Sequence, residues 1–396
     1  MPFALYMLAM AVFVMGTSEF MLAGLLPAIA TELAVPIGTA GLLTSAFAAG
    51  MVIGAPVMAA FARRWPPRVA LIVCLAVFAG CHVIAAMTSA FPLLLITRVL
   101  SAFSNAGFLA VALSTITTLV PAEQKGRALS VLLSGTTIAT VAGVPAGALL
   151  GTALGWRTTF WAITILCVPA IFGVARGTTN TAGQAVTDAS SPRLRAELSQ
   201  LAKPGLVVAM GLGALINGGT FAALTFLAPV VTGAAALTEE WVSVALVLYG
   251  IGSFFGVTVA GQLSDRRPAA VLAVGGPLLL TGWIVLALLA SHPVALMVLV
   301  LVQGFLSFGV GSTLIARVLY AASDAPTMGG SYATAALNTG AAAGPVLGAF
   351  GLNAGLGVAC TVLGRLGADG DRTCCHPCNR AYGHEDRCGC QALTCS

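Results

Sequence analysis

Glu19 and Arg98 are charged residues inside long apolar runs of the sequence, and they are the first candidates for chemistry. Glu19 is the only acidic residue between Met1 and Glu32. Within a bilayer a carboxylate costs at least about 2.5 kcal/mol on insertion scales, so it is expected to face a watery cavity or a partner. We interpret Glu19 as a candidate proton carrier. Alternatively, the span begins late and Glu19 lies at the outer interface.

Besides Glu19 and Arg98, three amides are polar candidates within apolar runs. Arg98 lies near the start of its run, and Asn105 follows two turns along on the same helical face. We expect Arg98 to be functional; a snorkelling arginine at a helix end is the alternative. Asn217 and Asn338 are lone amides, which could face a substrate cavity or form hydrogen bonds between helices.

The composition predicts a polytopic membrane protein. Of the 396 residues, 58% are hydrophobic and 8% are charged, and the mean hydropathy is +0.99. Soluble globular proteins carry about 25% charged residues, which excludes that class. The small positive charge gives no reason to expect nucleic acid. We expect no enzyme, metal or cofactor, because HExxH, GxSxG and GxxxxGK patterns are missing. His82 and His292 are not expected to carry protons.

Eleven apolar stretches are long enough to cross a bilayer. They lie near residues 3–29, 38–61, 69–88, 92–119, 128–153, 158–175, 205–231, 241–262, 269–290, 293–320 and 327–358. A polar stretch over residues 176–204 separates six spans from five and is interpreted as a linker.

The loops between these spans differ in positive charge. The odd-numbered loops carry only Arg157. The even-numbered loops carry Arg63, Arg64, Arg68, Lys125, Arg127, Arg176, Arg193, Arg195, Lys203, Arg266, Arg267 and Arg317. Because cytoplasmic loops are enriched in Lys and Arg, the protein is predicted to lie in the cell membrane with its N-terminus in the cytoplasm.

The two halves of the chain resemble each other at a shift of 202 residues. The shift aligns Gly50, Gly54, Arg64 and Pro66 with Gly252, Gly256, Arg266 and Pro268. This pattern predicts an internal duplication and two repeated halves that bind substrate between them. Arg98 aligns with Val300, so its charge is present in one half only.

Glycine and proline interrupt the fifth span. Gly143, Pro145 and Gly147 lie at its centre, and proline removes one helical hydrogen bond while glycine allows close helix contact. We therefore expect either a hinge or a tightly packed surface here. A similar Gly-Pro-Val-Leu-Gly sequence occupies residues 344–348 in span eleven.

Several motifs together resemble the drug:proton antiporter branch of the major facilitator superfamily, over roughly residues 1 to 357. They are GTSEFMLAGLLPAIATELAVPIGTAGLLTSAF, FARRWPPR, TRVLSAFSNAG, SGTTIATVAGVPAGALLG and GWRTTF. The resemblance implies an all-α fold of two six-helix repeats. It also implies that Glu19 and Arg98 couple protons to substrate, and that Gly143, Pro145 and Gly147 form the antiporter motif. Ala102 departs from the usual glycine of the fourth-span motif.

The resemblance further implies a conformational gate at the loops after spans two and eight. Asp265 and Arg266 keep the gate motif, whereas Arg63 replaces the aspartate in the first half. The gate of the first half is therefore altered, and Asp265 is expected to act as the cytoplasmic latch. An ordinary solvated turn at residues 265–266 is the alternative.

The implied function is proton-coupled export of a small apolar antibiotic by alternating access, with chloramphenicol the favoured substrate. The implied partners are the drug, protons and the lipid bilayer, in a monomer without a cofactor. A sugar or metabolite exporter of the same superfamily is one alternative. A membrane protein that has lost transport is another.

The last residues break the pattern. Residues 359–396 hold seven of the ten cysteines and no apolar span, where the repeat predicts a twelfth helix. We interpret this tail as out-of-frame sequence; a metal-binding tail is the alternative, although the cysteine spacing is irregular. The predicted divisions are residues 1–175, the linker 176–204, residues 205–358 and the tail.

Overall fold

A computed structural model of the chain describes residues 3–61, 65–119, 125–177, 197–264, 268–325 and 328–353. Every regular element in these ranges is a helix, which confirms the all-α prediction. The tail over residues 359–396 and most of the linker lie outside the described residues.

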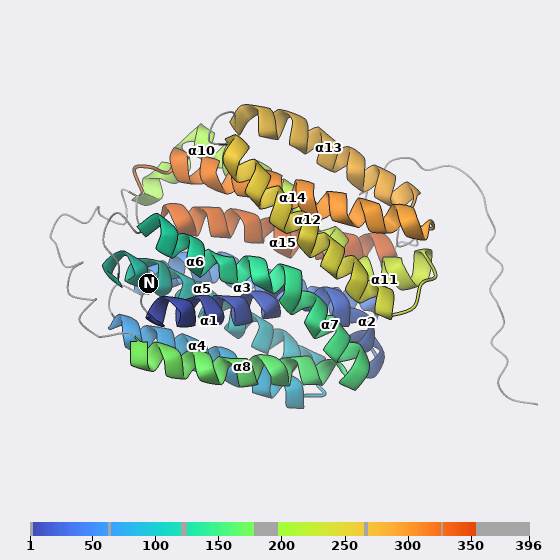
Figure 1. The fold of residues 1–396 in the computed structure, drawn as a ribbon, viewed down its shortest axis with the longest axis horizontal. Helices are drawn as coiled ribbons and strands as arrows, with labels where there is room; N and C mark the ends of the chain where they lie inside the picture. The colour runs from blue at the N-terminus through green and yellow to red at the C-terminus, as the bar shows by residue number, and fades with distance from the viewer. Residues whose placement is uncertain are drawn as a thin grey trace, which may run out of the picture. The chain divides into compact units, whose positions relative to one another are not determined.

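The first group of helices covers the segment before the linker (Figure 1). These are α1 (Phe3–Phe20), α2 (Leu22–Glu32), α3 (Ile37–Phe61), α4 (Pro67–Met87), α5 (Phe91–Leu119), α6 (Lys125–Ile138), the π-helix η3 (Ala139–Gly143), α7 (Val144–Leu154) and α8 (Trp156–Gly177).

The second group follows the linker and lies above the first in the view of Figure 1. It consists of the 3-10 helix η5 (Ser199–Ala202), α10 (Pro204–Thr225), α11 (Leu227–Pro229), the π-helix η6 (Val230–Ala234), α12 (Glu240–Ser264), α13 (Pro268–Leu288), α14 (Pro293–Ala321) and α15 (Gly329–Asn353).

Ten helices in the described ranges are long and apolar enough to cross a membrane. They correspond to the first ten predicted spans. The eleventh prediction falls on α15, which has 25 residues but includes Ser, Thr and Asn and is not among the ten. The first span is interrupted at Met21, so that α1 and α2 replace the single predicted helix.

Helices at matching places in the two groups have equal lengths. Helices α3 and α12 each have 25 residues, α4 and α13 each have 21, and α5 and α14 each have 29. Their packing also matches, because α3 and α4 contact α5 while α12 and α13 contact α14. Between the groups, α3 packs on α15, and α12 packs on η3 and α7.

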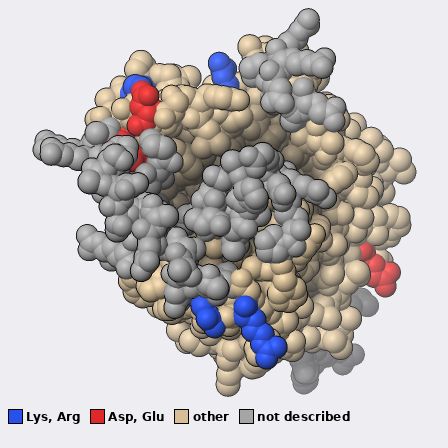
Figure 2. Space-filling model, turned by 60° about the vertical axis from the view of Figure 1, so that its left-hand side comes forward, with Lys and Arg blue, Asp and Glu red and all other residues tan. Residues whose placement is uncertain are grey.

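The surface of the helices is largely apolar. Large side chains such as Ile165, Leu215 and Phe255 are exposed, as expected for helices that face lipid. Figure 2 shows one face of the molecule, on which the charged side chains of the described residues form small groups and most of the other described surface is uncharged. The buried core of the first group contains Phe47 and Phe78.

Close contacts between backbones explain the small residues of spans five and eleven. A Cβ atom added to Gly143 would overlap the side chain of Thr17, because η3 lies directly against α1. One added to Gly344 would overlap the backbone of Gly218 on α10. The helical hydrogen-bonding pattern changes to the wider π form immediately before Pro145, which has no N–H to donate.

Candidate functional site

Arg98 of α5 is buried inside the first group of helices and is only 1% exposed. Its Nη1 donates to Ser18 Oγ at 3.0 Å, and its Nη2 donates to the Ser18 carbonyl oxygen at 3.0 Å. The guanidinium carbon lies 4.4 Å from the centre of the Phe47 ring, a cation–π arrangement. Arg98 therefore does not snorkel to the surface; it joins α5 to α1 and α3.

His82 of α4 completes this network. Its Nδ1 lies 2.8 Å from the carbonyl oxygen of Phe78, which can only accept, so we assign the proton to Nδ1. In neutral His82 the other ring nitrogen, Nε2, then accepts from Ser18 Oγ at 2.6 Å. The donors consequently run in one direction, from Arg98 to Ser18, from Ser18 to His82 and from His82 to Phe78.

Glu19 is the next residue along the chain and is half-buried. Within the described ranges no residue forms a hydrogen bond or an ion pair with its carboxylate, although Arg98 is near enough to attract it electrostatically. Nη1 and Nη2 of Arg98 donate to Ser18 instead, and its buried Nε–H has no hydrogen-bond partner among the described residues. Glu19 therefore keeps its carboxylate available to bind a proton or a ligand beside a fixed positive charge.

Aromatic rings form an apolar wall that begins at Phe20, the residue after Glu19 in the sequence. The ring of Phe20 lies 5.5 Å from that of Phe221 on α10 and 6.4 Å from that of Phe308 on α14. The ring of Phe308 lies 6.1 Å from that of Tyr249 on α12. These contacts cross from α1 to the second group of helices, so the aromatic wall lies at the junction between the two groups.

The three predicted amides have different surroundings. Asn105 is buried in α5. Asn217 Nδ2 donates to the Leu337 carbonyl oxygen at 2.7 Å, which joins α10 to α15. Asn338 Nδ2 donates to the Thr334 carbonyl oxygen of its own helix at 3.0 Å. The structure thus uses Asn217 between helices, the second of the two possibilities that the sequence left open.

The predicted gate and antiporter motifs are only partly described. Asp265 and Arg266 lie outside the described residues. Gly143, Pro145 and Gly147 are buried at the start of α7 and the end of η3. Gly250 of α12 packs directly against the backbone of η3, so the antiporter motif lies between α1 and the second group.

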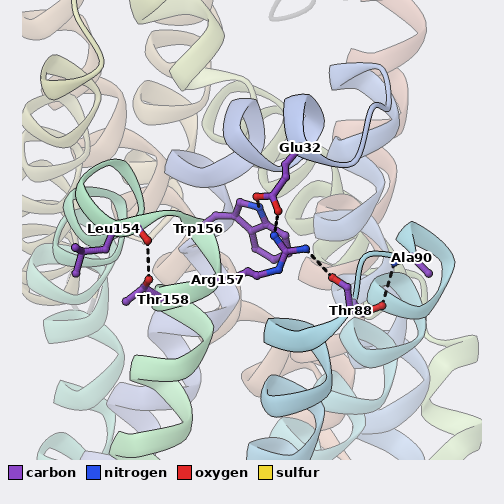
Figure 3. Close-up of polar contacts among 7 residues, drawn as sticks. All are labelled: Glu32, Thr88, Ala90, Leu154, Trp156, Arg157 and Thr158. Atoms are coloured by element: carbon purple, nitrogen blue, oxygen red, sulfur yellow. Dashed lines mark hydrogen bonds and ion pairs between the residues drawn. The ribbon is translucent and has the colours of Figure 1, made fainter.

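A second polar cluster lies where α2 and α4 end and α8 begins (Figure 3). The Glu32 carboxylate accepts from Trp156 Nε1 at 2.6 Å and forms an ion pair with Arg157. Arg157 Nη2 donates to the Thr88 carbonyl oxygen at 2.9 Å, and its guanidinium carbon lies 4.4 Å from the Trp156 ring centre. The cluster fixes the ends of α2 and α4 against the start of α8.

Sequence reasoning missed Ser18 and His82. His82 was set aside because no acid lies near it in the sequence, but the residues that contact it come from α1 and α5 by folding. The available signal was a histidine inside an apolar span, where a polar side chain needs a partner. Within the described ranges no group of three His, Cys, Asp or Glu side chains could hold a metal ion.

Comparisons with known proteins agree with this architecture. Residues 8–363 match the Major Facilitator Superfamily. The chain is 63% identical over 350 residues to a chloramphenicol resistance protein of Streptomyces lividans, covering 88% of this chain and 89% of the relative. It is 33% identical over 361 residues to the inner membrane transport protein YdhP of Escherichia coli K12, covering 90% of each.

The fold is found in a solved structure as well. A bacterial homolog of the human lysosomal transporter Spinster, in an inward-facing and unoccupied conformation, matches with a TM-score of 0.69 at 19% identity. The match covers 89% of this chain and 81% of that one. The predicted fold is thereby confirmed, and the chain belongs to the major facilitator superfamily.

Proposed function

We propose that this chain exports a small, largely apolar antibiotic in exchange for protons, and that chloramphenicol is its substrate. The observation that carries the proposal is the 63% identity, over most of both chains, to a relative named for chloramphenicol resistance. The junction between the two groups of helices supports it, because an aromatic wall there offers an apolar surface to the drug and begins one residue after Glu19.

Glu19 is the proposed coupling residue. When it is charged, Arg98 attracts it; when a proton neutralises it, that attraction is lost. The proton and the drug would compete for the Glu19 carboxylate, so each would favour a different conformation of the transporter. Ser18 and Phe47 hold the Arg98 guanidinium in place. Its positive charge therefore stays fixed while Glu19 gains or loses a proton.

One carboxyl is sufficient energetically. A charge that crosses 100 mV contributes about 2.3 kcal/mol, and each 1.4 kcal/mol is a factor of ten. One proton exchanged for one neutral drug therefore supports a drug gradient of roughly 40- to 50-fold before any pH difference is counted.

In the proposed topology the N-terminus and the linker lie in the cytoplasm. The proposed oligomeric state is a monomer. The bias of Lys and Arg toward even-numbered loops supports this orientation. The proposed halves cover residues 1–175 and 205–358, and the equal helix lengths in the two groups favour this division.

Drug uptake into everted membrane vesicles tests the function. Radiolabelled chloramphenicol is expected to accumulate when respiration energises the vesicles, and a protonophore is expected to abolish the accumulation. Vesicles that contain the folded, inserted chain but accumulate no drug would refute chloramphenicol export. Accumulation that survives the protonophore would refute the coupling to protons.

A further inference from the structure

A small cavity lies within the second group of helices, between α10, α12, α13 and α14. Its volume is about 20 Å³. Polar lining comes from Tyr249, Gln303 and Ser307, and apolar walls come from residues such as Leu286 and Trp283. None of the residues that line the cavity carries a charge. An ion would have no counter-charge there, so the cavity suits a neutral ligand.

Three buried oxygen atoms at this cavity have no hydrogen-bond partner among the described residues. They are Tyr249 Oη, Gln303 Oε1 and Ser307 Oγ, and the side chains that carry them are at least nine-tenths buried. The Tyr249 and Ser307 hydroxyls lie near each other but do not meet the distance and angle of a hydrogen bond. Buried polar atoms in native proteins are nearly always paired with protein or water, so three orphans at one cavity indicate a missing partner.

The internal repeat explains why the partner is missing. The cavity residues and their counterparts at the shift of 202 are Tyr249 and Phe47, Gln303 and Ser101, Ser307 and Asn105, and Thr220 and Ser18. The network around Arg98 and His82 fills the equivalent place in the first group of helices. At the positions that correspond to Arg98 and His82, the second group carries Val300 and Ile284. Their side chains form no hydrogen bonds, so the three oxygen atoms stay unpaired.

We infer that the Tyr249–Gln303–Ser307 pocket is a binding site for a single neutral hydroxyl group. Gln303 Oε1 can only accept a hydrogen bond, whereas the Tyr249 and Ser307 hydroxyls can donate or accept. A ligand that both donates and accepts satisfies all three, and a cavity of this size accommodates one water-sized group.

The hydroxyl has two possible sources, which the test separates. Water can supply it whether or not the chain transports anything. An alcohol group of the transported molecule can supply it as well, and this second source rests on the proposed function. The Tyr249 ring contacts Phe308 of the aromatic wall, so the pocket adjoins the junction between the two groups of helices.

Hydroxyl-radical footprinting of the purified full-length chain tests the site, because radiolysis of a bound water molecule produces radicals that modify the adjacent side chain. Without drug, Tyr249 is expected to be modified at least fivefold faster than Phe78, a fully buried ring that does not line this cavity. Modification of Tyr249 no faster than that of Phe78 would show a dry pocket and overturn the inference.

Addition of saturating chloramphenicol, which bears two hydroxyls, distinguishes the sources. Protection of Tyr249 by the drug, and not by an analogue that lacks its hydroxyls, assigns the site to the drug alcohol. Unchanged modification assigns it to water. Both results support the site. A chain that shows the modification but exports no drug would refute the proposed function and leave the site standing.

A substitution that copies the first half provides a second test. Ser307→Asn introduces the amide found at Asn105 and is expected to fill the cavity and to slow Tyr249 modification at least threefold. Ser312→Asn is the control, because Ser312 lies on the same helix outside the pocket. Equal modification in the two folded variants would count against the site, and the wild-type measurement still decides if Ser307→Asn does not fold.

Discussion

Removal of the Ser18 hydroxyl tests the network around Arg98. Ser18→Ala deletes the acceptor of the 3.0 Å bond from Arg98 Nη1 and the donor of the 2.6 Å bond to His82 Nε2. A hydrogen bond to a charged group contributes about 1.5 to 3 kcal/mol, and a neutral one contributes about 0.5 to 1.5 kcal/mol. The expected loss of folding free energy is therefore about 2 to 4 kcal/mol.

The same substitution should also impair export. Arg98, whose buried Nε–H already has no partner among the described residues, is left with a further unsatisfied N–H group, and Glu19 is the nearby carboxylate that can accept from it. A new charge-assisted bond of about 1.5 to 3 kcal/mol would hold Glu19 away from the proton and the drug. Because 1.4 kcal/mol is a factor of ten, we expect drug export to fall by roughly 10- to 100-fold.

Ser104→Ala is the matched control for Ser18→Ala. Ser104 is also buried, but its Oγ donates only to the Leu100 carbonyl oxygen of its own helix. Thermal unfolding in detergent and drug uptake by vesicles are measured for both variants at equal expression. If Ser18→Ala unfolds and transports as Ser104→Ala does, the network contributes nothing and the reasoning is wrong.

Three further predictions concern other contacts. Arg98→Lys should lose most export, because an ammonium cannot make both bonds to Ser18 while stacking on a ring, and vesicle uptake that matches wild type would contradict this. Arg157→Ala should lower the free energy of unfolding by about 1 kcal/mol, because the ion pair with Glu32 is partly exposed. A drop in unfolding temperature as large as that for Ser18→Ala would contradict this weak role. Gly143→Val should prevent folding, because its side chain would overlap Thr17, and Thr17→Gly should restore part of the expression; no restoration would argue against the contact.

Much of the fold follows from local properties of the sequence. Apolar length alone located the first ten spans, because a helix must bury its backbone polar groups wherever lipid surrounds it. The glycines and proline of span five predicted either a hinge or close packing. The structure shows close packing at Gly143 together with a π-helical segment before Pro145.

The candidate site was harder to predict, because it depends on contacts between distant residues. Glu19 and Arg98 could be identified one at a time, since a charge inside an apolar span is costly wherever it lies. The pairing of Ser18 with His82 could not be predicted, because these residues are 64 positions apart and only helix packing brings them together. A serine beside an acid carries no local signal, and the direction of its hydrogen bonds is visible only once Phe78 and Arg98 are in place.

Proton release upon drug binding tests the central claim most directly. Chloramphenicol is added to the purified chain in weakly buffered detergent solution with a pH indicator, and bound drug is counted in parallel. Wild type and Glu240→Gln, a control at the exposed start of α12, should release protons as they bind drug, whereas Glu19→Gln should release none. Equal proton release by folded Glu19→Gln would contradict the assignment of Glu19 as the coupling carboxyl.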